Sequence, residues 1–294
     1  MDKPRFNRKS LLRGMLLLLA IGSSLALGEN KVRILISNDD GYQDPGLKAL
    51  VARLAPLAEL VVAAPSVNQS GVGHGMTFKE PFAVESWTSE GNRWFSIAAL
   101  PATCVRIALT SLLDRPPDIV IAGINRGENL GVVTFSSGTV ACAREAAFRG
   151  IPGVSVNLQR GAVMDYEGTA DLVATLVEEL GVKRLAAGTY LNVNYPALPR
   201  DQIKGVLITR QDTRPPDERY EKITAPDGKI FYQSRWEPLK NGNPDTDTAA
   251  LDRGFISVTP LQIDQTRPSE LETLRSWRCM KSPLKPTKKM SGRG

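Results

Sequence analysis

Two adjacent carboxylates, Asp39 and Asp40, follow a short apolar run near the start of this 294-residue chain. Neighbouring carboxylates repel one another unless a cation or a proton relieves them. Ser and Asn side chains in the segments 68–71 and 123–129 offer neutral oxygens that could complete a site for a hard cation such as Mg²⁺ or Mn²⁺. Taken alone, the segment 38–41 is also typical of an ordinary turn and helix cap.

A second candidate for chemistry is the Ser-Gly-Thr stretch at 137–139, which opens a predicted helix. Backbone N–H groups at a helix N-terminus bind phosphate, although ordinary capping by Ser or Thr explains the same residues. His74 is the single histidine, so a zinc site with several His ligands is excluded, and any Ser-His-Asp triad would have to use it. It is a candidate acid for a leaving oxygen, with a surface or structural role as the alternative.

The elements that must position these residues alternate along the chain. Apolar runs at 32–36, 60–65, 118–122, 154–156 and 190–193 predict buried strands, and helical spacing predicts helices at 45–57, 103–113, 139–148 and 170–180. Residues 78–99 are typical of a hairpin. This order predicts an α/β fold with a doubly wound, mostly parallel sheet. The carboxyl ends of its strands would gather the acidic pair and both polar segments at one edge.

The pattern changes after about residue 200. Strands are predicted at 206–209 and 256–260, and between them lies a stretch rich in Pro, Gly and charge, 211–247, with Phe231-Tyr232 as its one strand-like core. We expect a long irregular segment here, of the kind that serves function or reaches a partner.

Both ends of the chain differ from its body. Residues 1–28 combine a basic start, a Leu-rich run and the small residues of Ala26-Leu27-Gly28, which predicts a cleaved signal peptide and a periplasmic or secreted protein, not membrane-bound after cleavage. An uncleaved anchor is the alternative. The tail 281–294 carries five basic residues and no acid, and is predicted to be disordered.

The net charge of +6 comes from these two ends, because residues 29–280 sum to −3. Binding to nucleic acid is therefore not predicted, since it needs a basic face on the folded body. The three cysteines, Cys104, Cys142 and Cys279, show no C-x-x-C spacing, and no disulfide can be assigned to them.

Taken together and in order, five stretches of the chain resemble the SurE family, the stationary-phase survival proteins that are metal-dependent 5′/3′-nucleotidases. The resemblance covers about residues 31–265. Its matching stretches are 33–41, 68–71, 117–125 with Asn129 and Gly131, 137–140, and Thr246-Asp247 followed by 254–261.

The resemblance implies a Rossmann-like core, within a phosphatase domain at 29–280, and a β-rich extension at about 211–247 that is exchanged between subunits. It implies hydrolysis of nucleoside monophosphates with one divalent cation, Mg²⁺ or Mn²⁺, per subunit, and a homodimer or homotetramer formed through the extension. The residues that it assigns to the cation are Asp39, Asp40, Ser70 and Asn125, with both aspartates catalytic. Those that it assigns to the substrate phosphate are Asn129, Ser137, Gly138 and Thr139.

The chain departs from the family pattern at three places. Ser136 stands where a Tyr is common, Val132-Val133 stand where acids are common, and the aromatic pair expected after Pro226-Asp227-Gly228 is replaced by Tyr232-Gln233. Two alternatives therefore stay open: a broad-specificity exported acid phosphatase or polyphosphatase, and an inactive nucleotide- or metal-binding module.

Overall fold

The computed structural model describes residues 31–183, 185–237, 239–240, 242–277 and 280. The predicted signal peptide 1–28, Cys279 and the basic tail 281–294 lie outside these residues. Within the described part of the chain, no helix is both long enough and apolar enough to cross a membrane.

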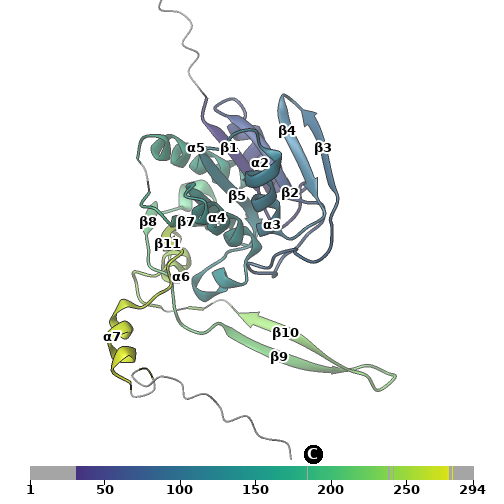
Figure 1. Ribbon diagram of the computed structural model, residues 1–294. Helices are drawn as coiled ribbons and strands as arrows, with labels where there is room; N and C mark the ends of the chain where they lie inside the picture. The colour runs from purple at the N-terminus through teal and green to yellow at the C-terminus, as the bar shows by residue number, and fades with distance from the viewer. Residues whose placement is uncertain (1–30, 184, 238, 241, 278–279, 281–294) are drawn as a thin grey trace, which may run out of the picture.

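A nine-stranded sheet forms the centre of the molecule, in the order β3-β4-β2-β1-β5-β6-β7-β11-β8 (Figure 1). Neighbouring strands are parallel except β3 with β4 and β7 with β11. The α/β prediction is confirmed. The strands are β1 (Arg33–Ser37), β2 (Glu59–Pro65), β3 (Val84–Ser89), β4 (Asn92–Ile97), β5 (Ile119–Arg126), β6 (Gly153–Leu158), β7 (Thr189–Tyr195), β8 (Val206–Ile208) and β11 (Ile256–Gln262).

Helices cover both faces of this sheet, which explains why its strands are continuously apolar. On β1, Ile34 and Ile36 pack in one core with α2 and α5, whereas Leu35 packs in a second core with α3 and α4. The helices are α2 (Pro45–Leu54), α3 (Pro101–Ile107) with a π-helical turn η1 (Ala108–Leu112), α4 (Gly138–Phe148), α5 (Tyr166–Val182), α6 (Asp247–Asp252) and α7 (Pro268–Ser276); short 3₁₀ turns are η2 (Gly131–Phe135) and η3 (Arg200–Gln202).

The strand order reverses between β1 and β5, because the chain runs from β1 outward to β2 and later returns to place β5 on the other side of β1. Ligands of doubly wound sheets bind at such a point, beyond the carboxyl ends of the strands. β5 is longer than the predicted 118–122 and reaches Arg126, with an irregular register toward β6 between Ala122 and Asn125. Asn125 is therefore held on the strand itself.

The expectation of an irregular segment at 211–247 is wrong. Residues 217–237 form an antiparallel hairpin of β9 (Asp217–Thr224) and β10 (Ile230–Glu237), here called the arm, which projects from the body of the molecule (Figure 1). Every residue of both strands is exposed. Charged residues recur throughout these strands, so no continuous apolar run marks them in the sequence. The β-rich extension that the family resemblance implied is present.

Candidate active site

The acidic pair lies on a tight turn directly after β1. The Asn38 side chain holds this turn from both sides: its amide donates to the carbonyl of Gly41 at 2.9 Å, and its Oδ1 accepts from the Gly41 N–H at 3.1 Å. Gly41 has φ +102°, a conformation that favours glycine. Asn38 and Gly41 thus fix the direction in which Asp39 and Asp40 leave the strand.

Asp39 is buried against the start of α4, and its carboxylate accepts a hydrogen bond from the hydroxyl of Thr139. Burial raises the pKa of Asp39 to about 6; the neighbouring charge of Asp40 acts in the same direction and the Thr139 hydrogen bond opposes both. A charge held in such a place favours a bound cation, which would offset its desolvation. The Thr139 hydroxyl therefore orients the Asp39 carboxylate.

The neutral oxygens expected beside the acids are close by. The Asn125 amide donates to the Gly127 carbonyl at 2.7 Å, which turns its Oδ1 toward the site, 3.4 Å from Thr139 Oγ1. Asp40 lies beside them, accepting from Asn68 Nδ2 at 2.9 Å and from the Arg126 N–H at 3.1 Å.

No three His, Cys, Asp or Glu side chains of the described residues come together as a metal cluster, so neutral oxygens would have to complete a cation site here. Asp39, Asp40, Asn125 and Ser70 supply that combination of oxygen donors, and it fits Mg²⁺ or Mn²⁺.

All of these residues except Asp40 border a cleft of about 570 Å³. Asp39, Ser70 and Asn125 lie in its wall together with Asn129 and Ser137. Two cations that the sequence did not single out, Arg126 and Arg160, also line it. So do Pro216, directly before the arm, and Glu218 and Trp236 of the arm. The cleft therefore extends from the acidic turn to the base of the arm.

Asn129 is fixed by buried asparagines on the neighbouring strands. Its N–H donates to Asn194 Oδ1 at 2.8 Å, its amide donates to Asn157 Oδ1 at 2.7 Å, and its carbonyl accepts from Asn192 Nδ2 at 2.8 Å. Sequence reasoning missed these supports. The signal for them was an asparagine recurring inside otherwise apolar strands, since a buried amide must find partners.

A helix, α4, begins at the predicted Ser-Gly-Thr stretch. Ser137 is the N-cap of α4, and its hydroxyl accepts from the Val140 N–H at 3.1 Å. Gly138 allows the helix to lie directly against the acidic turn, because a Cβ at this position would come within 2.7 Å of Asp39 Cβ. The N-terminal end of α4, which is the positive end of its dipole, consequently lies against the acidic turn.

His74 is brought to a different group of residues. Its Nε2 lies 3.2 Å from Oε2 of Glu145, a fully buried carboxylate that also accepts two hydrogen bonds from Arg106, at 2.7 and 2.9 Å. Burial alone would raise the pKa of Glu145, but the hydrogen bonds from His74 and Arg106 outweigh it and lower that pKa. The structure thus places His74 within hydrogen-bond distance of Glu145 on α4, and His74 is not among the residues that line the cleft.

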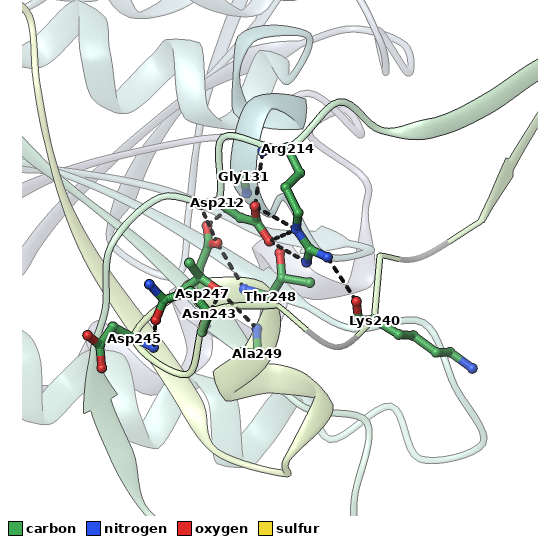
Figure 2. Close-up of polar contacts among 10 residues, drawn as sticks. Gly131, Asp212, Arg214, Lys240, Asn243, Asp245, Asp247, Thr248 and Ala249 are labelled. Atoms are coloured by element: carbon green, nitrogen blue, oxygen red, sulfur yellow. Dashed lines mark hydrogen bonds and ion pairs between the residues drawn. The ribbon is translucent and has the colours of Figure 1, made fainter.

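The arm is fastened to the cleft by Asp247, the N-terminal residue of α6 (Figure 2). This buried carboxylate accepts from the N–H of Gly131 at 2.8 Å and from the N–H of Asp212 at 3.0 Å. Asp212 in turn pairs with Arg214 at 2.6 Å, and Arg214 donates to the Lys240 carbonyl at 2.9 Å on the returning side of the arm. Gly131 begins η2, whose Val132 and Val133 line the cleft, so one side chain joins the arm base to the cleft wall.

Comparison with known proteins agrees with this geometry. The family model described as "Survival protein SurE" matches residues 34–218. The chain belongs to the SurE family. The 5′-nucleotidase SurE of Methylococcus capsulatus is 40% identical over 247 residues, covering 84% of this chain and 97% of the relative. The 5′-nucleotidase SurE of Syntrophobacter fumaroxidans is 38% identical over 248 residues, covering 84% and 99%.

The fold is shared as well. The crystal structure of the SurE protein from Aquifex aeolicus superposes with a TM-score of 0.73 at 36% identity, covering 83% of this chain and 98% of that one. Membership in SurE, with relatives that are named nucleotidases, supports an enzyme of the nucleotidase or phosphatase class. Cys104 and Cys142 are buried free thiols in this fold.

Proposed function

We propose that this protein hydrolyses nucleoside monophosphates to nucleoside and phosphate, and that it needs a divalent cation to do so. One observation carries the proposal: the side-chain oxygens of Asp39 and Asn125 both lie next to the Thr139 hydroxyl. This group of oxygens lies at one end of the cleft, beside the start of α4. Asp39, Asp40, Ser70 and Asn125 would hold the cation, which when bound supplies Lewis acidity toward the phosphoryl group.

The chain's own residues would then bind and orient the phosphate. The N–H groups at the start of α4 would stabilise the negative charge that develops on its oxygens, and Asn129, held by its asparagine partners, would contribute a fixed polar side chain. Arg126 and Arg160 add positive charge to the same cleft.

The other end of the cleft supports a nucleoside as the leaving group. Trp236 of the arm and Pro216 directly before it line this end and offer an apolar surface, and bases stack on aromatic side chains without hydrogen-bond readout. A broad phosphatase would make no use of this surface. The test is a panel of AMP, p-nitrophenyl phosphate and polyphosphate: we expect kcat/KM to be highest for AMP, and equal values across the panel would favour the broad phosphatase.

We infer that a second copy of the chain covers the arm. Opposite faces of the hairpin differ, and one of them carries Tyr220, Tyr232, Trp236 and Ile230, all between 45% and 65% exposed. An apolar surface of this kind on a projecting hairpin is typical of an interface. Light scattering of a chain whose residues 215–237 are replaced by a Gly/Ser linker should show loss of the homodimer or homotetramer. A native chain that is monomeric at micromolar concentration would contradict the proposed interface.

The predicted export rests on the sequence of residues 1–28. We propose that the protein is periplasmic or secreted and acts on nucleotides outside the cytoplasm. Mass spectrometry of the native protein should find a chain that begins near Glu29, and an intact Met1 found solely in the cytoplasm would reject export.

A further inference from the structure

A second cavity, of about 390 Å³, borders η2, as does the cleft described above. Thr134 and Phe135 of η2 line this cavity, whereas Val132 and Val133 of the same turn line the cleft. The rest of its wall comes from α4, β7, the end of β11 and the segment after β8. Nothing in the hydrolysis described above uses this space.

Arg144 of α4 lines the cavity and is 6% exposed. Its Nε donates to the Tyr190 hydroxyl at 3.0 Å, and its Nη2 lies 3.5 Å from the Thr134 carbonyl. The guanidinium also lies over two aromatic rings, 5.7 Å from the centroid of Phe135 and 5.6 Å from that of Tyr190. All of these partners are neutral.

Glu145, the next residue on α4, has the oppositely charged partners that Arg144 lacks among the described residues. Glu145 pairs with Arg106 at 2.7 Å and lies 3.8 Å from Arg149, but among the described ion pairs none includes Arg144. A buried charge without a counter-charge is costly, and arginine has five N–H donors in a planar fork suited to an oxyanion. A cavity next to a buried guanidinium that has no ion-pair partner among the described residues suits an anion.

The rim of the cavity extends this chemistry. Arg210, which is exposed, adds a second positive charge, and Gln262 and Gln265 add amide groups; Asp264 is the one acid in the wall. Two arginines against one carboxylate leave the cavity positive. We propose that it binds a phosphate-type oxyanion, with Arg144 as the principal ligand. This proposal does not depend on the hydrolysis of nucleotides.

The test is isothermal titration of the full chain with inorganic phosphate, in EDTA and a chloride buffer, so that no divalent cation assists binding in the catalytic cleft. Arg144→Met keeps the length of the side chain and removes its charge. We expect it to weaken phosphate binding at least about tenfold, the loss of one charge-assisted contact. The matched control is Arg149→Met, at the residue that caps the C-terminus of the same helix. This variant should bind phosphate as the wild type does.

A substitution at a buried position can also unfold the chain, so circular dichroism accompanies each titration. If Arg144→Met is unfolded, Arg144→Lys keeps the charge but not the fork and should still bind phosphate more weakly than the wild type. Equal phosphate affinity in the wild type and the folded Arg144 variant overturns the proposal. That same result is expected if a second copy of the chain, rather than an oxyanion, fills the cavity.

Discussion

Gly138 lies so close to Asp39 that a Cβ on the glycine would stand 2.7 Å from Asp39 Cβ and 2.9 Å from Asp39 Oδ2. The helix start that would bind the phosphate and the acid that would bind the cation are thus positioned by the same contact. The helix start and the Asp39 carboxylate can lie this close because residue 138 is a glycine and has no Cβ.

Gly138→Ala should therefore push α4 and Asp39 apart and lower kcat/KM for AMP by about 100-fold, the cost of a small misplacement of reacting groups. Gly181→Ala is the control, because this glycine near the end of α5 has nothing within 4 Å of the added Cβ. Steady-state kinetics of both variants check the prediction. Wild-type activity in Gly138→Ala would contradict the geometry given for the site.

Asp39→Asn and Asp40→Asn should each lower kcat for AMP by about 100-fold or more, since each removes one charge from the proposed cation site. Neither substitution should unfold the chain. The buried Asp39 is costly to ionise, so its neutral replacement should leave Tm unchanged or raised. Phosphate release and a thermal melt, made on the same preparations, check both parts. Wild-type turnover in either metal-replete variant would refute the assignment of that aspartate.

Trp236→Ala should raise KM for AMP by about tenfold and leave KM for polyphosphate, which has no aromatic ring, nearly unchanged, because base stacking on an aromatic ring contributes about 1–3 kcal/mol per base. Phe231→Ala, on the opposite face of the arm, is the matched control. An equal rise in KM for both substrates in Trp236→Ala would show that the tryptophan supports the cleft without recognising the base.

Asp247→Asn should lower the free energy of unfolding by about 1–3 kcal/mol, because its carboxylate accepts three backbone N–H groups and an amide has one acceptor oxygen. The exposed Asp245, two residues earlier, gives the control variant Asp245→Asn. Urea denaturation measures both. Equal stability of the two variants would show that Asp247 does not fasten the arm base to the cleft.

The stability of α5 should depend on pH through Asp165, its N-cap. Hydrogen bonds from Arg200 lower the pKa of Asp165, so the pair stabilises the fold above the ordinary aspartate pKa of about 3.9, and this contribution is lost as pH falls through the lowered value. Arg200→Met should lower Tm at pH 7, and the difference should shrink at acid pH. A difference of the same size at pH 7 and pH 2 would contradict the pairing.

The sequence sufficed for the sheet and for the parts of the site that follow its strands. β1 and its acidic turn could be predicted because a buried strand must be apolar on both faces and must end where polar residues begin. The place of Asn125 followed from the same rule, although the strand extends beyond its apolar run to include it.

The arm could not be predicted in the same way, because its strands lie in solvent and no apolar periodicity marks them. Three other features also involve segments that lie far apart in the chain. They are the hydrogen bonds of Asp247, the asparagines around Asn129 and the neutral residues around Arg144. Their partners depend on the folded arrangement, which single-residue patterns do not contain.

If the oxygens around Asp39 bind the cation as proposed, hydrolysis of AMP requires that cation. Phosphate release from AMP, measured on the purified chain in EDTA and again after Mn²⁺ or Mg²⁺ is restored, tests this requirement most directly. We predict that EDTA abolishes release and that one of the two cations restores it in the wild type but not in Asp39→Asn. Undiminished release in EDTA, or no release from AMP under any of these conditions, would contradict the account.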